Sequence, residues 1–229
     1  MKILQVVEEY TDAFLDLIYP PISICHMCGG SLPFIPEHHC IKCGMPLRMI
    51  EDGSICQECK DHKHHYFNRA IAVVKYEEDV KKLIYRFKYS GHTYLARTMG
   101  TMMAHKLMQE GIPIDIILPV PLYIGKEKDR GFNQATLLSK YISKEANIPL
   151  ELDVLIRIKN TKVMHTLNKR QRQENVRDAF KVTKEGVILN KHILLVDDIF
   201  TTGSTVNACS NLLLSFGAET VTVLTFARD

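Results

Sequence analysis

One segment near the carboxyl end of the chain constrains the fold more than any other. Residues 192–197 (HILLVD) are almost wholly apolar, a second acid follows at Asp198, and a Thr/Gly/Ser loop over 201–205 leads into an apolar helical pattern over 204–216. A strand, a short polar loop and a helix in this order are typical of an α/β sheet, whose ligands bind beyond the carboxyl ends of the strands. We therefore expect a functional site at this loop.

The chain from residue 67 to residue 229 repeats the alternation of strand and helix. The sequence predicts strands at 70–75, 114–120, 192–197 and 220–226, and helices at 80–91, 93–110, 133–146 and 204–216. Strands that are nearly all apolar are buried on both faces, as in a parallel sheet covered by helices. The predicted fold class is therefore α/β with a parallel, Rossmann-like sheet. A stripe of methionines in the second helix is interpreted as core packing.

The loop after the strand has the composition of a phosphate site. Its hydroxyl side chains are Thr201, Thr202, Ser204 and Thr205. Backbone N–H groups at a helix start favour a phosphate, and Gly203 permits its close approach. Asp197 and Asp198 are suited to the vicinal hydroxyls of a sugar, or to Mg²⁺. This combination favours a sugar phosphate; the alternative is a capping turn with Thr201 or Ser204 as the N-cap.

Six of the seven cysteines lie together in the amino-terminal part of the chain. They form three C-x-x-C pairs, Cys25 with Cys28, Cys40 with Cys43, and Cys56 with Cys59. In a reducing compartment this spacing is typical of structural Zn²⁺ sites, because four thiolates enclose one ion. A redox motif is the alternative, but the surrounding Gly and Pro residues are typical of loops. Either one pair is spare, or two ions share the six thiolates with histidines such as His38, His39, His62 or His64. The seventh cysteine, Cys209, is interpreted as a buried apolar residue.

These patterns predict two domains. Residues 1–66 hold a helix over 3–18 and the Cys-rich zinc-binding module, and residues 67–229 hold the α/β domain. The composition, 46% hydrophobic and 24% charged, is that of a globular protein, and the net charge of +3 is too small to indicate a nucleic-acid partner. Without an apolar run of about 20 residues or a signal-peptide pattern, we expect a cytoplasmic protein that does not insert into a membrane.

Two basic segments have open interpretations. Lys126, Lys128 and Arg130 follow the strand over 114–120 and are suited either to an anionic ligand or to a solvated loop. The run from Arg130 to Gln134 (RGFNQ) is either an element that binds an anion or base edge, or a capped helix start anchored by Phe132. Residues 157–181 carry eight Lys/Arg against two acids. We interpret them as a flexible basic arm that forms a lid, since a track for single-stranded nucleic acid needs more aromatic residues than this segment holds.

Several of these motifs resemble those of known families. Val196–Thr205 resembles the loop that binds phosphoribosyl pyrophosphate (PRPP) in type I phosphoribosyltransferases, with Phe200 where smaller aliphatic residues are usual. Further motifs resemble the ComF competence-protein family over nearly the full length, zinc module included. They are Leu17–Pro21 (LIYPP), Phe87–Gly91 (FKYSG), Pro119–Leu122 (PVPL), Arg130–Ala135 (RGFNQA) and the stretch from Leu167 to Phe180.

The resemblance implies a function and roles for the site residues. It implies that PRPP binds with Mg²⁺, that Thr201, Thr202, Gly203, Ser204 and Thr205 hold the 5′-phosphate, and that Asp197 and Asp198 hold the ribose hydroxyls. Lys126, Lys128 and Arg130 would hold the leaving pyrophosphate, and Asp197, Asp198 and Arg130 would be catalytic. Thr201 stands where purine-salvage relatives place an acidic base, which argues against salvage of the hypoxanthine type.

The resemblance also implies a cellular role and leaves a rival open. The implied role is natural competence, in which the protein acts on incoming single-stranded DNA together with a helicase-like partner. The rival is a non-catalytic zinc-ribbon module that binds single-stranded DNA or a partner protein and keeps a vestigial sugar-phosphate pocket.

Overall fold

A computed structural model of the chain describes residues 32–47, 54–61, 65–89, 91–160 and 179–229. The predicted helix over 3–18, the pair Cys25 and Cys28, and residues 161–178 of the basic segment lie outside the described residues.

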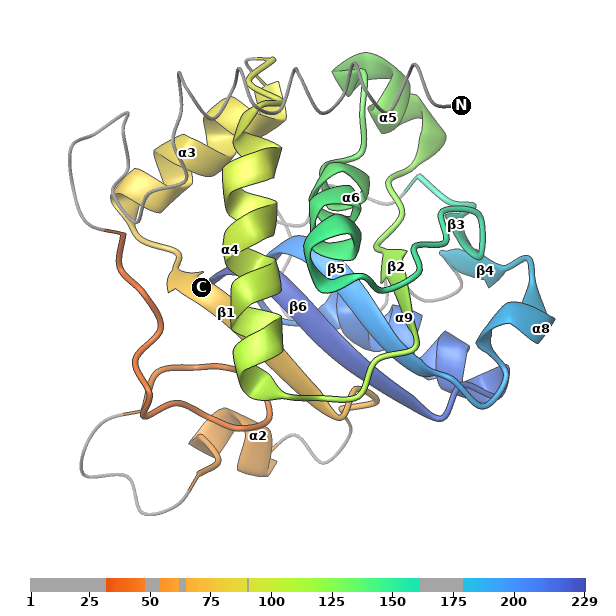
Figure 1. Ribbon diagram of the computed structural model, residues 1–229, viewed down its shortest axis with the longest axis horizontal. Helices are drawn as coiled ribbons and strands as arrows, with labels where there is room; N and C mark the ends of the chain where they lie inside the picture. Colours follow the sequence, from red (N-terminus) through yellow and green to blue (C-terminus); the bar gives the residue numbers. More distant parts are fainter. Residues whose placement is uncertain (1–31, 48–53, 62–64, 90, 161–178) are drawn as a thin grey trace.

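A parallel sheet forms the centre of the described chain (Figure 1). Its four strands follow the order β1-β6-β5-β2, with each neighbouring pair parallel. They span Arg69–Lys75 (β1), Thr220–Arg228 (β6), His192–Phe200 (β5) and Ile116–Pro119 (β2). The predicted α/β class with a parallel sheet is confirmed.

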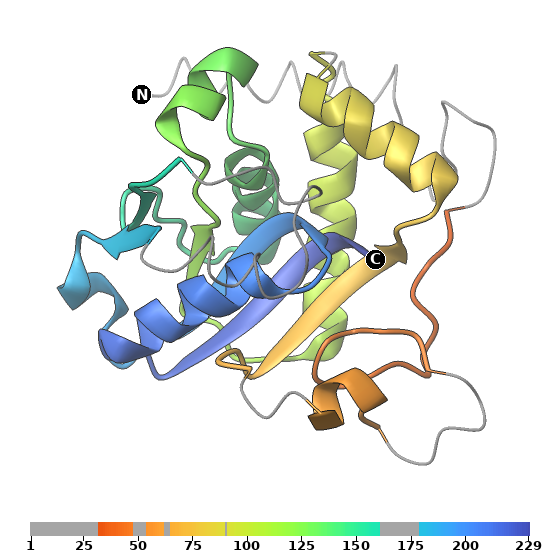
Figure 2. The same ribbon diagram turned by 180° about the vertical axis from the view of Figure 1, so that it is seen from behind.

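Helices cover both faces of this sheet. On one face lie α4 (Leu95–Glu110) and α6 (Gln134–Ala146), and on the other lies α9 (Ser204–Ser215), as Figures 1 and 2 show from opposite sides. Beyond the carboxyl ends of the strands lie α3 (Glu78–Tyr89) and α5 (Ile124–Arg130). The sequence predicted α3, α4, α6 and α9 to within a few residues, but not α5 or the short helices α2 (Gln57–Asp61) and α8 (Glu185–Ile188).

The two faces of β5 explain why its sequence is apolar throughout. Ile193 and Leu195 are buried in the core beneath α9, whereas Leu194 and Val196 are buried in the core beneath α4 and α6. Successive side chains of a strand point to opposite faces, so a strand covered on both sides needs apolar residues at every position. Buried methionines of α4 complete the second core, as predicted for that stripe.

The strand β5 is longer than predicted, and this changes the position of the two acids. The predicted strand ended at Asp197, but β5 continues to Phe200 because β6 extends to Arg228 and pairs with it there. Asp197 and Asp198 therefore lie inside the paired part of β5, near its carboxyl end. As successive residues of a strand, they point to opposite faces of the sheet. The twin acids occupy two different environments.

A short antiparallel ribbon borders the basic segment. Leu155–Arg157 (β3) pairs with Phe180–Val182 (β4). The prediction of an irregular arm over the whole of 157–181 is therefore wrong at both ends. Three-residue strands carry too little alternation to be recognised in a sequence.

The cysteine-bearing loops lie against the edge strand β1. The backbone N–H groups of Ile35 and Ala70 donate to the carbonyls of Val73 and Lys42 at 2.9 and 2.8 Å. These contacts cover the exposed edge of the sheet on the β1 side. The division between residues 66 and 67 stays a prediction.

Within the described part of the chain, no helix combines the length and the apolar character needed to cross a membrane.

The contact between α4 and α6 supplies a test of the packing. A Cβ added at Gly100 would lie 2.6 Å from the Cβ of Tyr141 and 3.1 Å from the carbonyl oxygen of Leu138. We expect Gly100→Ala to lower the free energy of unfolding by about 1–3 kcal/mol, because the helices must separate. Chemical denaturation measures the change. The control is Gly186→Ala in α8, where nothing lies within 4 Å; an equal loss there would contradict the prediction.

Candidate functional site

The end of β5 and the start of α9 enclose a small cavity. Its volume is about 40 Å³, and its lining comprises Asp197 and the residues from Ile199 to Val206. A space of this size holds about three water-sized groups, comparable to the oxygens of one phosphate. The loop over 201–205 and Asp197 therefore face a common cavity, as the sequence predicted for a ligand site.

The first turn of α9 is not capped by a side chain. The N-cap residue is Gly203, in the left-handed region with φ of +70°, and it makes no side-chain cap hydrogen bond. The hydroxyls of Thr202 and Ser204 instead contact each other at 2.9 Å. The capping alternative, with Thr201 or Ser204 as the N-cap, is wrong. A helix start whose N-cap is glycine has no capping side chain of its own to compete with an anion for its N–H groups.

The side chain of Phe200 packs against the loop that follows β5. Its ring is buried, and a Cβ on Gly203 would lie 2.6 Å from it, so only glycine fits above the ring. The ring of Phe67 packs edge-on at 5.8 Å, and the guanidinium of Arg228 lies 4.6 Å from the ring centre. The aromatic residue at position 200 is thus a packing anchor for the loop.

Asp197 faces the α9 side of the sheet, where its charge is costly. Burial and the neighbouring Asp198 carboxylate raise the pKa of Asp197 to about 7, although Lys88 and Arg157 act in the opposite direction. The Asp197 carboxylate accepts a hydrogen bond from the backbone N–H of Asp198 at 2.8 Å. Near neutral pH a carboxyl group with this pKa is partly protonated, and a cation or hydrogen-bond donor beside it favours the charged form.

Asp198 faces the opposite side and forms a buried ion pair. Its Oδ2 lies 2.8 Å from Nζ of Lys88, and the side chains are 10% and 20% exposed. Burial by itself would lower the pKa of Lys88, but the Asp198 charge and hydrogen bond raise it above the ordinary value. Lys88 belongs to the FKYSG motif at the end of α3. The pair thus fixes α3 against the end of β5.

Further cations gather near the acids. Burial, followed by the charges of Arg157 and Arg130, lowers the pKa of Lys126. Burial also lowers the pKa of Arg157, whereas Cys209 and Asp197 act in the opposite direction. The charges of Arg157 and Arg130 act unfavourably on that of Lys126, and a bound polyanion would offset this repulsion. Lys128, predicted with this group, is exposed on the last turn of α5.

The residues of the RGFNQ run have two kinds of role: some stabilise the fold, and others lie at the candidate site. Asn133 caps α6 by accepting from the N–H of Ala135 at 3.0 Å, and Phe132 packs 5.9 Å from Phe87, so the structural interpretation holds for both. Arg130 contacts the end of α3 and the start of α6. Its guanidinium is 4.8 Å from the centre of the Tyr89 ring and donates to the side chain of Gln134. Nε2 of Gln134 is buried without a partner among the described residues. A buried donor beside an arginine suits an anionic ligand.

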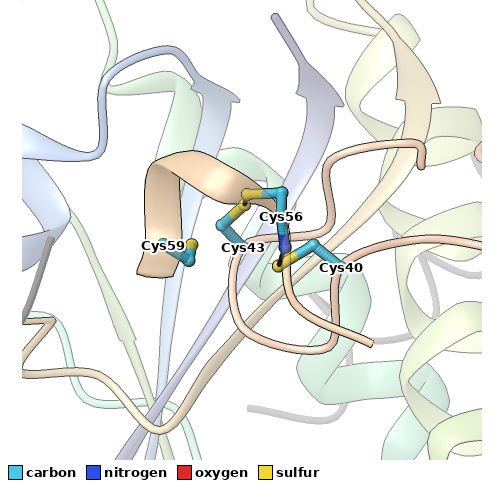
Figure 3. Close-up of side chains that lie close together, drawn as sticks. All are labelled: Cys40, Cys43, Cys56 and Cys59. Atoms are coloured by element: carbon cyan, nitrogen blue, oxygen red, sulfur yellow. Dashed lines mark hydrogen bonds between the residues drawn. The ribbon is translucent and has the colours of Figure 1, made fainter. Parts of the chain in front are cut away.

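A second site lies in the cysteine-bearing loops. The sulfurs of Cys40, Cys43, Cys56 and Cys59 all lie within 4.8 Å of one another, and Figure 3 shows the four side chains converging. The sulfurs of Cys43 and Cys56 are 3.7 Å apart. A tetrahedral zinc site with bonds of about 2.3 Å separates its sulfurs by about 3.8 Å, so the four residues fit this metal. His38 and His39 are not part of this described group, and His62 and His64 lie outside the described residues.

Arg228 connects the cysteine site to the loop after β5. Its Nε donates to the carbonyl of Cys43 at 3.1 Å, and Nη1 donates to the carbonyl of Thr201 at 2.8 Å. The side chain is buried, with 5% exposed. A guanidinium has donors on a rigid plane, so it holds both loops at a fixed separation.

Known proteins resemble both the carboxyl-terminal part of this chain and nearly its full length. Residues 128–229 match the model of the phosphoribosyl transferase domain. Competence protein F of Haemophilus influenzae is 30% identical over 213 residues, covering 90% of each chain. The chain belongs to the ComF family. The DNA utilization protein YhgH of Escherichia coli K12 is also 30% identical, over 90% of each chain. Competence protein ComFC of Bacillus subtilis is 26% identical, over 98% of this chain and 92% of its own.

Two residues of the site were missed by the sequence analysis. Lys88 was noted only as part of a family motif, and Arg157 only as the first charge of a basic segment. A lysine one position before the end of a short amphipathic helix gives no sign that a carboxylate 110 positions later will pair with it. Lys88 and Arg157 interact with the acids of β5 only because α3 and β3 pack beside that strand in the folded protein.

The raised pKa of Asp197 predicts a pH dependence of stability. Since the folded state holds this proton more tightly than an unfolded aspartate does, Asp197 destabilises the fold progressively as the pH rises from about 4 to about 7. We expect the free energy of unfolding of Asp197→Asn to fall less than that of the wild type over this pH range, by a few kcal/mol. Urea denaturation at several pH values across the range measures the difference. Asp153→Asn, at a carboxylate that is 81% exposed, is the control. Parallel profiles for wild type and Asp197→Asn would contradict the prediction.

The cysteine cluster predicts which thiols retain the metal. We expect Cys56→Ser to lose most of the bound zinc and to lower the melting temperature, because a tetrahedral site loses one of its ligands. Cys209→Ser, at a buried thiol in α9, is expected to keep the zinc. Elemental analysis of both purified variants measures the content. Equal zinc in the two variants would exclude this cluster as the binding site.

Proposed function

We propose that this protein binds PRPP together with Mg²⁺ and acts as a phosphoribosyltransferase-like protein in the handling of imported DNA. The observation that carries the proposal is the cavity of about 40 Å³ between β5 and α9, where Asp197 and an uncapped helix start face each other. The match of residues 128–229 to the phosphoribosyl transferase domain supports the same ligand class. The printed names of the relatives, competence and DNA utilization proteins, support the cellular role.

In the proposed complex the loop holds the 5′-phosphate. The N–H groups at the start of α9 would donate to its oxygens, and the hydroxyls of Thr202 and Ser204, now bonded to each other, are near enough to join them. The left-handed Gly203 presents the backbone to the ligand without a side chain. These groups bind a phosphate without using a charged side chain.

The carboxylates serve the ribose and the metal. Asp197 lines the cavity and would accept the ribose hydroxyls, while Asp198 holds Lys88 in place behind it. A divalent cation fits here because it would offset the repulsion that raises the pKa of Asp197. When bound, Mg²⁺ would supply neutralisation of the pyrophosphate charge.

The cations Lys126, Arg130 and Arg157 are assigned to the pyrophosphate. Transfer would break the bond between the anomeric carbon and the pyrophosphate oxygen, which leaves with the electron pair, while the acceptor atom bonds to the same carbon. The cations would stabilise the charge that develops on the leaving group. This assignment adds Arg157 to the predicted residues and makes Lys128, which is exposed, a peripheral contact.

In the non-catalytic alternative, the protein binds the sugar phosphate but does not catalyse its transfer. A pocket without a site for an acceptor would favour this rival, whereas Thr201 argues only against salvage of the hypoxanthine type. Release of pyrophosphate from PRPP, assayed against free bases and single-stranded DNA, separates the two. Binding without release under every acceptor would support the rival.

Ligand binding is tested by thermal stability. We expect PRPP with Mg²⁺ to raise the melting temperature, because a ligand that binds only the folded state stabilises it. Asp197→Asn and Asp198→Asn are each expected to weaken PRPP binding by about tenfold or more, through loss of a charge-assisted contact in the first case and release of Lys88 in the second. The matched control is Asp153→Asn. An unchanged shift in both site variants would refute the assignment.

A further inference from the structure

The cysteine-bearing part of the chain is hydrogen-bonded to the phosphate loop and its helix at two separate places. At the first, the buried guanidinium of Arg228 donates to the carbonyl of Cys43 at 3.1 Å and to that of Thr201 at 2.8 Å. At the second, the side-chain oxygen of Asn207 in α9 accepts from the backbone N–H of Tyr66 at 2.7 Å. The segment that holds the loop is therefore tied to the cysteine-bearing part on both sides of Gly203.

The contact with Arg228 orients two peptide groups of the loop. Nη1 donates to the carbonyl of Phe200 at 3.3 Å as well as to that of Thr201, so one nitrogen holds the carbonyls of two successive residues. A peptide group is planar and trans, which means that its N–H points opposite to its C=O. The N–H groups of Thr201 and Thr202 belong to these two peptide groups, and both residues line the cavity. Arg228 therefore fixes the direction of two donors that belong to the loop.

A row of ring contacts joins the same two sites. Nε2 of His65 lies 3.5 Å from Sγ of Cys59, and the His65 ring packs 4.9 Å from that of the buried Phe67. The Phe67 ring packs edge-on against Phe200, which in turn packs against the loop at Gly203. Closely packed side chains transmit a displacement, because they leave little free space in which to absorb it. A shift of the cysteine loops thus reaches the phosphate loop through packing as well as through hydrogen bonds.

The charge of a metal-bound cluster favours the same position of Arg228. Four thiolates would carry more negative charge than one Zn²⁺ neutralises. Nη2 of Arg228 lies 4.0 Å from Sγ of Cys43, so the buried guanidinium lies where this excess charge attracts it. Because the same guanidinium holds the carbonyl of Thr201, the metal site and the loop share one side chain.

We propose that the metal-bound cysteine cluster controls the affinity of the phosphate loop, and that Arg228 is the positioning residue that couples the two sites. The inference rests on the proposed function, because the loop is assigned to the 5′-phosphate. Loss of the metal would release the loop that carries Cys43, and the donors of Thr201 and Thr202 would lose their fixed direction. By thermodynamic reciprocity, a phosphate ligand on the loop would tighten zinc binding by the same factor. A zinc ion that only stabilises its own loops would not show this reciprocal effect.

The reciprocal effect is measured on the full-length zinc-bound protein with ribose 5-phosphate as the probe. This compound carries the 5′-phosphate but lacks the pyrophosphate, which would itself bind zinc. We expect saturating ribose 5-phosphate to raise the affinity for zinc by about tenfold, measured by equilibrium competition with a chromophoric chelator. Bound ribose 5-phosphate that leaves the zinc affinity of the wild type unchanged would overturn the inference.

Arg228→Lys tests the coupling residue, because lysine keeps the charge but not the planar fork of donors. We expect this variant to bind ribose 5-phosphate about tenfold more weakly and to show no change of zinc affinity when the probe binds. Arg86→Lys, at an exposed arginine of α3, is the matched control and is expected to behave as the wild type does. An equal response of zinc affinity in the wild type and in Arg228→Lys would exclude Arg228 as the coupling residue.

Asn207→Ala is a second variant that decides the question if Arg228→Lys does not fold. It removes the acceptor of the Tyr66 N–H, and we expect it to reduce the coupling between ribose 5-phosphate and zinc by about threefold. Asn211→Ala, at an exposed position one turn further along α9, is expected to keep the full coupling. Equal coupling in the two asparagine variants would contradict the proposed connection.

Amide hydrogen exchange gives a readout that needs no ligand. We expect removal of zinc from the wild type to increase exchange over residues 201–207 by about tenfold, and to change it much less in α6, on the other face of the sheet. Unchanged exchange over 201–207, or an equal increase in α6, would overturn the inference. If exchange follows zinc while neither ribose 5-phosphate nor PRPP binds the wild type, the phosphate assignment fails and the coupling between the two sites is supported.

Discussion

Two adjacent carboxylates at the end of a buried strand impose the main physical constraint on this protein. Because β5 is covered on both faces, each charge must find compensation on its own side of the sheet. Asp198 pairs with Lys88 of α3, and Asp197 lies near Arg157 in β3. The two acids therefore help to fix the positions of α3 and of the ribbon formed by β3 and β4. An unpaired charge at either position would cost several kcal/mol.

The same constraint explains why the candidate site is built from distant motifs. The FKYSG motif supplies Lys88 and Tyr89, the RGFNQA motif supplies Arg130, and the strand–loop–helix segment supplies the acids and the phosphate loop. Each motif also has a structural component, since Phe87 contacts Phe132 and Asn133 caps α6. The FKYSG and RGFNQA motifs therefore combine residues that pack the fold with charged residues that lie near the two acids.

The cysteine site and the phosphate loop are joined rather than independent. Arg228 donates to the carbonyls of both Cys43 and Thr201, and its guanidinium packs on Phe200 beneath the loop. The bulky residue at position 200 fits because Gly203 leaves room above it. Metal-bound cysteines would hold one end of this arrangement rigidly, since thiolate ligands fix the loops that carry them.

The sequence by itself determined whatever depends on local pattern. Continuous apolar runs predicted the strands, the spacing of C-x-x-C pairs predicted the thiol cluster of which four members converge, and one short segment predicted the strand, polar loop and helix that line the cavity. Tertiary structure alone decided that β5 runs on to Phe200, which places the acids on opposite faces, and that Lys88, Arg157 and Arg228 reach partners far away in the chain. The reason is physical: periodicity reports which face of an element is buried, whereas the partner of a charged side chain depends on strand order and helix position, which no local pattern contains.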